Sequence, residues 1–364
     1  MSLIGATIDD LDTPVLCVDL DAMESNIREL AGACRQQGVA WRPHAKCHKS
    51  IDVGRKLIAA GAIGLTCAKL GEAEVFAAAG IKDLLIANEL VGPQKVRRLV
   101  ELRRIANPVF CIDHLDQARP ISDAMQAAGL RVRAVLEINI GMNRAGILPG
   151  EPALALANEV KNLPGIELSG VMAWEGHLVI IEDQTEKQTR IRAALSQLMA
   201  TRDLLVSEGI PCPIVSCGGT GSYPTSLTHP GVTEIEAGGA IFMDSFYRRK
   251  CRISAFQLAL KVVATVVSRP APERAIIDAG RKTMNMEMAM PFIDGRDDIE
   301  VKSLSAEHGT LILAPSAQNL RIGDRLEVIP GYSDFTNVLH DQFYALRGNR
   351  IEAIWPLQGR GKLA

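Results

Sequence analysis

The sequence lacks an excess of charge of either sign. Its 364 residues include 40 basic and 42 acidic side chains, which leaves a formal net charge of −2. Proteins that bind nucleic acid or anionic membranes usually carry a clear basic excess, so this balance disfavours both partners. We expect a small-molecule partner instead.

Long apolar runs are also missing. No stretch reaches the ~20 apolar residues that cross a bilayer. The opening MSLIGATIDDLDTPVLCVDLD has acidic residues where a secretion signal has a basic start and an apolar run. Together these absences predict a cytoplasmic protein with no membrane partner.

Paired cysteines are absent as well. The eight cysteines form no CxxC pair, and several lie in apolar runs such as VLCVDL and PVFCID. This scatter favours buried, reduced thiols over disulfides or a zinc cluster.

What the chain does have is a repeated pattern of short apolar runs. Eight of them are candidate strands, at residues 39–46, 62–68, 83–88, 108–113, 133–139, 167–174, 213–219 and 233–239. Most are separated by amphipathic stretches that end near a glycine, as in 49–61, 69–80 and 184–209. Such alternation predicts parallel βαβ units, and eight units fit an α/β fold of the (β/α)8 barrel type.

The pattern changes after residue 255. Runs such as FQLALKVVATVVSRP and DRLEVIPGY are rich in β-forming residues and lack long helices between them. We therefore predict a barrel over residues 26–252 and a C-terminal β domain over 253–364. The N-terminal segment 1–25 contributes an extra strand, TPVLCVDLD, which is expected to join the β domain.

Unusual polar residues follow the predicted barrel strands. Lys46 ends the first strand, Arg144 follows the fifth, and Trp174 and His177 follow the sixth. Because the active site of a (β/α)8 barrel lies at the carboxyl ends of its strands, we expect these residues on one rim.

The stretch RPHAKCHKS, at residues 42–50, offers three interpretations. A partly desolvated lysine at a strand end is suited to form a Schiff base, which favours Lys46 as a reactive amine. Alternatively, Lys46 and Lys49 open the next helix on its solvent side. His44 and His48 suggest a metal site, but two histidines alone do not complete one.

A second motif, CGGTGS at residues 217–222, places three glycines after the seventh strand. Its glycine amides and hydroxyls can hold a phosphate. The spacing matches neither nucleotide-binding signature, so the motif indicates a single phosphate or, alternatively, a tight turn that needs positive φ. Gly238 and Gly239, after the eighth strand, are expected to add amides to the same site.

A Schiff-base lysine opposite a single-phosphate site is what pyridoxal phosphate requires. The chain also resembles the fold-type III pyridoxal phosphate family that includes alanine racemase, and most closely its D-threonine aldolase and D-serine dehydratase branch. The resemblance extends from about residue 8 to the C-terminus and rests on TPVLCVDLDAMESNI, RPHAKCHKS, INIGMNRAGI, CGGTGSY, DAGRK and EHG.

The resemblance implies roles for individual residues. Lys46 carries the Schiff base, Arg144 contacts the phenolic oxygen of the ring, and Trp174 stands where relatives often have a tyrosine near the ring nitrogen. The phosphate loop consists of Gly219, Thr220, Gly221 and Ser222. The resemblance also implies a homodimer.

The chain departs from the family at the metal site. Metal-dependent members carry a His-x-Cys or His-x-Asp pair in the β domain, whereas PGYSDFTNVLHD has Tyr332 and Asp334 at these positions. A neutral phenol is a poor ligand for Mn²⁺, Mg²⁺ or Zn²⁺, so a metal on Asp334 is disfavoured. His340, eight residues beyond Tyr332, is expected to be a packed or surface histidine.

A second departure concerns the acid–base group. Related aldolases tend to have a further histidine where this chain has Ile180, so His177 becomes the leading candidate. Tyr332 is another candidate, and it would serve as a proton donor or acceptor if pyridoxal and Lys46 lower its pKa.

These residues predict a pyridoxal phosphate-dependent lyase acting on D-configured β-hydroxy-α-amino acids, with aldol cleavage favoured over dehydration. One alternative is a metal-independent amino-acid racemase that uses Lys46 and Tyr332 as opposed bases. Another is a noncatalytic pyridoxal phosphate carrier or regulator, which the long β domain argues against.

Overall fold

The computed structural model describes residues 3–364 and divides into two compact units. The barrel unit comprises residues 30–46, 53–238 and 361–364, and the β unit comprises the residues up to 29, 47–52 and 239–360. The domain boundaries predicted at residues 25 and 252 remain predictions.

The barrel unit contains one parallel sheet whose strand order is β2-β9-β8-β7-β6-β5-β4-β3. A parallel bridge between His44 and Thr66 joins the segment after β2 to β3. This confirms the predicted (β/α)8 architecture and all eight strands. Their bounds are β2 Ala40–Trp41, β3 Leu65–Cys67, β4 Asp83–Glu89, β5 Asn107–Ile112, β6 Val132–Glu137, β7 Ile166–Met172, β8 Ile214–Cys217 and β9 Glu234–Ile235.

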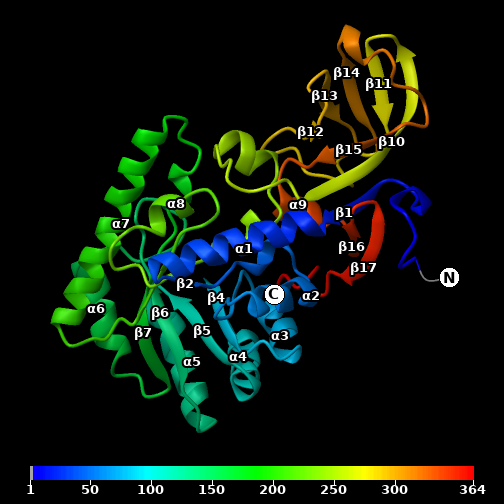
Figure 1. Cartoon of the computed structure of the whole chain (residues 1–364). Helices are drawn as coiled ribbons and strands as arrows, with labels where there is room; N and C mark the ends of the chain where they lie inside the picture. The colour runs from blue at the N-terminus through cyan, green and yellow to red at the C-terminus, as the bar shows by residue number, and fades with distance from the viewer. Residues whose placement is uncertain (1–2) are drawn as a thin grey trace. The chain divides into compact units, whose positions relative to one another are not determined.

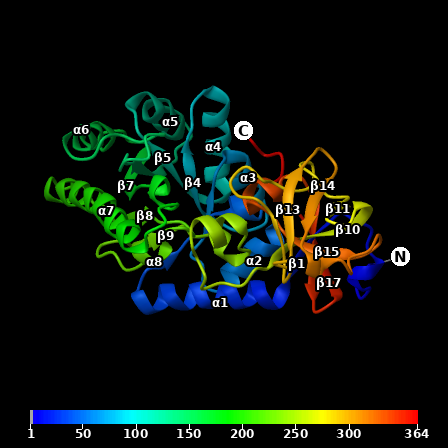
Figure 2. The same cartoon turned by 90° about the horizontal axis from the view of Figure 1, so that it is seen from above.

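Helices alternate with these strands along the chain, and Figure 2 shows α4 to α7 outside the strands of the sheet. Five successive strands contribute the buried apolar cluster Leu85, Val109, Cys111, Val135, Met172 and Ile214. Burial of this cluster holds the strand ends in place. The helix bounds are α1 Leu20–Gln37, α2 Ile51–Ala59, α3 Leu70–Ala78, α4 Pro93–Ile105, α5 Leu115–Ala127, α6 Glu151–Val160, α7 Gln184–Ser207 and α8 Tyr223–Ser226.

The β unit is built on a nine-stranded sheet, and Figure 1 shows β10, β11, β13 and β14 side by side in it. Strand β1 pairs antiparallel with β10 and parallel with β16, which confirms that the N-terminal strand joins the β domain. Helix α9, Ser333–Asn337, follows β15. The strand bounds are β1 Val15–Asp19, β10 Leu260–Ala271, β11 Arg274–Ile277, β12 Phe292–Ile293, β13 Ile299–Leu304, β14 Gly309–Leu313, β15 Arg325–Ile329, β16 Gln342–Arg347 and β17 Arg350–Pro356.

The first predicted barrel strand is shorter than expected. Regular pairing in β2 covers only Ala40–Trp41, and Ala45–Cys47 form a 3-10 turn. Pro43 lacks an N–H for the strand ladder, although its carbonyl oxygen accepts a hydrogen bond from Thr66 N at 3.0 Å. Because the turn ends the extended backbone, His44, Lys46 and His48 do not share one face of a strand.

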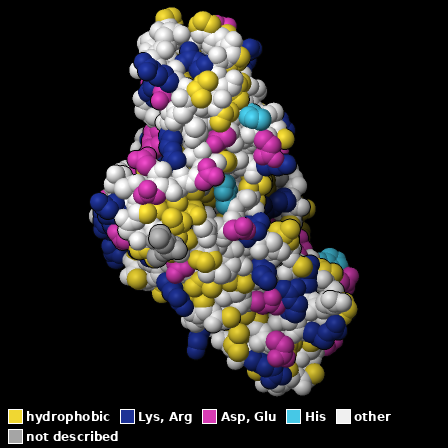
Figure 3. Space-filling model, turned by 90° about the vertical axis from the view of Figure 1, so that its right-hand side faces the viewer, with side chains coloured by type: hydrophobic (Ala, Val, Ile, Leu, Met, Phe, Trp, Pro, Cys, Tyr) yellow, Lys and Arg dark blue, Asp and Glu magenta, His cyan; other side chains and the backbone are white. Residues whose placement is uncertain are grey.

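The surface and the cysteines match the sequence pattern. Figure 3 shows basic and acidic side chains interspersed over the face it draws. In the described part of the chain, none of the eight cysteines forms a disulfide, and all but Cys212 are buried. Within residues 3–364, no helix is long and apolar enough to span a membrane.

Candidate active site

Lys46 lies in the turn that follows β2, and its side chain is partly buried. The preceding residues hold this turn in place. His44 N donates to the carbonyl oxygen of Glu236 at 3.0 Å, and His44 Nδ1 accepts from Lys46 N at 3.4 Å. Lys46 therefore sits at the carboxyl end of the first barrel strand, next to the segment that follows β9.

Arg42, in the same motif, has a structural role. Its guanidinium is buried, donates to both oxygens of Glu234, and also pairs with Asp83. A buried charge needs this kind of paired partner, and removal of one member is costly. Arg42 therefore links the end of β2 to β9 and β4.

Glu236 is a neighbour of Lys46 that the sequence patterns did not single out. Ser216 Oγ donates to its carboxyl group at 2.9 Å. The pKa of Glu236 is raised to about 8, mainly by burial and also by Glu234 and Glu137, while Ser216 and the charge of Lys46 act in the opposite direction. At neutral pH the group beside Lys46 is therefore mostly a neutral carboxylic acid. Its only sequence signal was an acidic residue at the end of a predicted strand.

Arg144 lies after β6, and its Nη2 is 3.7 Å from Glu137 Oε1. The Arg144 side chain is half exposed, whereas Glu137 is buried. The pKa of Glu137 is raised to about 7, mainly by burial and by the neighbouring Glu89, while Arg144 acts in the opposite direction. Arg144 is thus held loosely through one guanidinium nitrogen, and about half of its side chain stays exposed.

The CGGTGS loop connects β8 to α8. Gly218 has a φ of +75°, as the turn interpretation predicted, and Gly219 N donates to Ser222 Oγ at 3.1 Å. Thr220 is 2% exposed, and its Oγ1 has no hydrogen-bond partner within residues 3–364. A buried hydroxyl without a partner is costly, so this atom fits an oxygen of a bound phosphate.

Trp174 packs against this loop. A Cβ on Gly219 would lie 2.4 Å from Trp174 Cη2, and one on Gly176 would lie 2.0 Å from Trp174 Nε1. Both positions therefore require glycine for a packing reason. The contact with the ring nitrogen of a cofactor remains a prediction for Trp174.

Gly238 and Gly239 are also packing positions. A Cβ on Gly238 would lie 2.3 Å from the carbonyl oxygen of His44, and one on Gly239 would lie 2.4 Å from Cε2 of Tyr247. These contacts explain the two glycines without a ligand. Their predicted role as phosphate-binding amides stays a prediction.

Glu175, between Trp174 and His177, is a second residue that the sequence analysis missed. It is fully buried, and its Oε1 accepts from Ser226 Oγ at 2.6 Å. This bond ties the segment after β7 to α8, which follows the phosphate loop. Glu175 thereby stabilises the position of both neighbouring candidates.

His177 lies against the loop that follows β6. A Cβ on Gly141 would lie 2.8 Å from His177 Nε2, so this glycine makes room for the ring. Burial and the charge of Arg190 lower the pKa of His177 below its usual value of 6.5. Its Nδ1 is buried without a hydrogen-bond partner in the described chain. His177 is therefore a neutral imidazole near neutral pH and can accept a proton.

In the β unit, the Tyr332 hydroxyl donates to Asp334 Oδ2 at 2.9 Å. Burial, together with the negative charge of Asp334, raises the pKa of Tyr332 well above its usual value. Desolvation therefore disfavours the phenolate in this chain, and a role of Tyr332 as a base with pyridoxal and Lys46 stays a prediction.

The Tyr332 and Asp334 pair does not fit a divalent metal. A phenol that keeps its proton is a hydrogen-bond donor to Asp334 and not a ligand. Across the described residues, no group of three or more His, Cys, Asp or Glu side chains is arranged to hold a metal ion. His340 packs in the same unit, with Nε2 2.8 Å from the carbonyl oxygen of Thr283.

Comparison with known proteins gives matches along the whole chain. Residues 18–246 match the family described as "Alanine racemase, N-terminal domain", and residues 259–346 match "Putative serine dehydratase domain". The chain is 35% identical to the D-threonine aldolase of Arthrobacter sp. over 98% of this chain and 95% of that protein.

Two further matches extend this result. The 3-hydroxy-D-aspartate aldolase of Paracoccus denitrificans is 32% identical over 99% of this chain and 95% of its own length. The crystal structure of D-threonine aldolase from Filomicrobium marinum superimposes with a TM-score of 0.96 at 34% identity and covers 100% of both chains.

Proposed function

The chain belongs to the fold-type III pyridoxal phosphate-dependent enzymes, and on this premise we propose that it is a lyase for D-configured β-hydroxy-α-amino acids. Aldol cleavage is favoured over dehydration. The observation that carries the proposal is His177, whose neutral imidazole belongs to the same unit as Lys46 and Thr220. The names of the Arthrobacter and Paracoccus relatives support the substrate class.

The barrel unit offers residues that suit the cofactor. Lys46 would bind its aldehyde carbon, Arg144 its phenolic oxygen, and Thr220 and Ser222 its phosphate. The partnerless Oγ1 of Thr220 supports the phosphate position. When bound, pyridoxal phosphate supplies a ring that stabilises negative charge on the substrate Cα.

Aldol cleavage needs a base for the β-hydroxyl proton. His177 is suited to this role because its lowered pKa leaves the ring nitrogen unprotonated near neutral pH. As the Cα–Cβ bond breaks, the proton of the hydroxyl group passes to His177 and the β carbon becomes an aldehyde. Tyr332 is the alternative candidate for this role, and its raised pKa makes it the weaker base.

Dehydration makes a different demand. Hydroxide is a poor leaving group, and a Lewis-acidic metal normally assists its departure. The hydrogen-bonded Tyr332 and Asp334 pair does not suit such a metal. Because these two side chains do not suit a metal, we favour aldol cleavage over dehydration. In dehydration, Lys46 would remove the α proton.

The racemase and the noncatalytic carrier fit these residues less well. A racemase needs Tyr332 as a base, and the raised pKa of its phenol opposes that role. A noncatalytic carrier has no use for a neutral, partnerless imidazole at His177. We also retain the homodimer and the cytoplasmic location as proposals.

The test is a substrate panel on the purified protein supplied with pyridoxal phosphate. D-threonine, D-3-hydroxyaspartate, D-serine and D-alanine are each assayed for aldehyde, for ammonia and for loss of optical rotation, with EDTA or with Mn²⁺. We expect aldehyde release that EDTA leaves unchanged. Ammonia release would instead support the dehydratase, and loss of rotation alone the racemase.

Two variants tie the activity to its residues. Lys46→Ala should remove both the visible absorption of the bound cofactor and the activity. His177→Asn should lower kcat while the visible absorption remains, and His114→Asn, at an exposed helix start, serves as the matched control. A protein that stays colourless with pyridoxal phosphate would overturn the whole scheme.

A further inference from the structure

Glu236 connects the segment of Lys46 to the CGGTGS loop. Its backbone N donates to the carbonyl oxygens of Cys217 and Gly218, each at 3.1 Å, at the start of this loop. Its own carbonyl oxygen accepts from His44 N at 3.0 Å, two residues before Lys46. All of these residues belong to the barrel unit. One residue is therefore bonded to both segments that are candidates for holding the cofactor.

The Glu236 side chain adds a bond to strand β8. Ser216 Oγ donates to Glu236 Oε1 at 2.9 Å, and both residues are buried. Ser216 is also held on its other side, because its carbonyl oxygen accepts from Ala173 N at 3.0 Å. The side chain of Glu236 is thus bonded to a strand that is itself fixed between its two neighbours.

Glu234, two residues earlier, has a different partner. Side chains two positions apart in a strand share a face, so both carboxyl groups lie on the same side of β9. Arg42 donates to both oxygens of Glu234, whereas the printed bond of Glu236 comes from the uncharged hydroxyl of Ser216. Charge pairing therefore accounts for Glu234, and hydrogen bonding to β8 distinguishes Glu236.

The segment 236–238 is held firmly against the residues that precede Lys46. Trp41 Nε1 donates to the carbonyl oxygen of Ala237 at 2.8 Å, and a Cβ on Gly238 would lie 2.3 Å from the carbonyl oxygen of His44. This close packing leaves little freedom on the Lys46 side. The bonds from Glu236 to β8 therefore determine how the CGGTGS loop lies relative to Lys46.

This spacing matters for a ligand that is held at two points. The aldehyde and phosphate groups of pyridoxal phosphate are substituents of neighbouring ring carbons, so their separation is restricted. A second attachment strengthens binding only when the two positions in the protein match the ligand. Lys46 and the buried, partnerless Oγ1 of Thr220 are the two candidate positions within the described chain.

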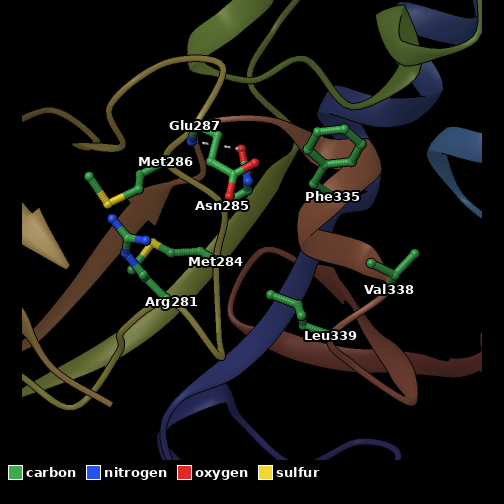
Figure 4. Close-up of a pocket in the computed structure, with 8 residues that line it drawn as sticks. All are labelled: Arg281, Met284, Asn285, Met286, Glu287, Phe335, Val338 and Leu339. Carbon is green, nitrogen blue, oxygen red and sulfur yellow. Dashed lines mark hydrogen bonds between the residues drawn. The ribbon is translucent and has the colours of Figure 1, made fainter. Parts of the chain in front are cut away.

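A cleft of the β unit offers no equivalent pair of positions. It has a volume of about 390 Å³, and Figure 4 shows Phe335, Val338 and Leu339 on its α9 side, opposite the segment from Arg281 to Glu287. Among the described residues that line it there is neither a lysine nor a glycine. The two attachment points are therefore assigned to the barrel unit.

We propose that Glu236 is a positioning residue whose hydrogen bond from Ser216 sets the spacing between Lys46 and the CGGTGS loop, and thereby the affinity for pyridoxal phosphate. This rests on the proposed function, in which Lys46 binds the aldehyde carbon and Thr220 the phosphate. Pyridoxal lacks the phosphate, so its binding uses Lys46 but not the spacing. The ratio of the two affinities separates the spacing from the reactivity of Lys46.

The test measures the dissociation constants of pyridoxal phosphate and of pyridoxal by titration of the visible absorption. Glu236→Met keeps a side chain of similar length but cannot accept from Ser216. It should weaken the binding of pyridoxal phosphate by about three- to tenfold, as expected for loss of one hydrogen bond, and leave pyridoxal unchanged.

Glu236→Gln is the conservative variant. The pKa of Glu236 is about 8, so the side chain is mostly neutral near pH 7, and glutamine preserves both its charge and its acceptor oxygen. The affinity ratio of this variant at pH 7 should equal that of the wild type. A ratio as low as that of Glu236→Met would overturn the proposal.

A double-mutant cycle tests the bond itself. Ser216→Ala should reproduce the loss seen in Glu236→Met, and the double variant should lose no more than either single variant, because both remove the same hydrogen bond. Additive losses would overturn the proposal. Equal losses for pyridoxal phosphate and pyridoxal would also overturn it, because they indicate an effect on Lys46 and not on the spacing.

Ser122→Ala is the matched control. Ser122 Oγ is buried in the same unit and accepts from Gly165 N at 3.0 Å, so its loss should lower the melting temperature without changing either dissociation constant. A wild type that binds no pyridoxal phosphate would overturn the cofactor assignment and this proposal together. A wild type that shows the expected ratios but releases no aldehyde would support the positioning role and overturn only the lyase function.

Discussion

Asn337 Nδ2 donates a hydrogen bond to the carbonyl oxygen of Cys47, the residue that follows Lys46 in the chain. Both partners are buried within the β unit. Helix α9, which begins after Tyr332 and carries Asp334, is therefore bonded to the 47–52 segment of the same unit.

The bond between Asn337 and Cys47 should matter for stability. Asn337→Ala removes this buried hydrogen bond, which should lower the free energy of unfolding by about 0.5–1.5 kcal/mol. Urea denaturation measures the loss. Asn162→Ala, whose side-chain bond to Asn158 is exposed, should change stability little; equal losses for the two variants would contradict the argument.

Thr220→Val should preserve or raise the stability of the cofactor-free protein and should weaken the binding of pyridoxal phosphate. The partnerless Oγ1 is a cost in the free protein, so its removal should leave stability unchanged or raise it by up to about 1 kcal/mol. Cofactor affinity should fall by about tenfold, as expected when a phosphate loses one hydrogen bond. Thermal melting with and without pyridoxal phosphate separates the two effects, and unchanged affinity would exclude Thr220 from the phosphate site.

The acid limb of the pH profile should report His177. Its pKa in the folded protein lies below 6.5, so the ring stays neutral and active as the pH falls past 6.5 and loses activity only at lower pH. His177→Gln should lower kcat by about 10²- to 10⁴-fold and abolish this limb. A limb that survives the substitution would assign it to another group, and His177 would not be the base.

Glu236 should make stability fall as the pH rises. Its pKa is about 8 in the folded protein against a usual value of 4.5, so between these values the folded state binds more protons than the unfolded state. The contribution of Glu236 to the free energy of unfolding is fully present below pH 4.5 and is lost as the pH rises through 8. The slope of this loss is up to about 1.4 kcal/mol per pH unit.

The measurement is the free energy of unfolding at several pH values between 6.5 and 8. This window avoids His48, whose pKa burial lowers to about 3, because His48 is neutral in both states above its usual 6.5. Asp244, whose pKa is about 7, and Glu137 contribute slopes of the same sign. Glu236→Gln should therefore reduce the slope without abolishing it; an unchanged slope would show that Glu236 is ionised in the folded protein.

Several features of the site were predictable because they depend on local pattern. Apolar periodicity located all eight barrel strands, and the connectivity of such strands places residues like Lys46 and His177 at their carboxyl ends. The glycines of the CGGTGS loop also had a local reason, since Gly218 needs a positive φ. Other features had no local signal: Glu236, Glu175 and Tyr247 look like ordinary residues of strands and turns.

The sequence by itself determined the alternation of strands and helices and the joining of the N-terminal strand to the β unit, and it supplied the candidate lysine and the candidate glycine-rich loop. Only the tertiary structure decided which titratable side chains near the candidate residues keep their protons. Burial among Phe246, Tyr247 and Phe335 keeps the Tyr332 phenol protonated, and burial beside Ser216 keeps Glu236 protonated near pH 7. Desolvation and hydrogen bonding depend on residues distant in the chain, and for that reason no local pattern could predict them.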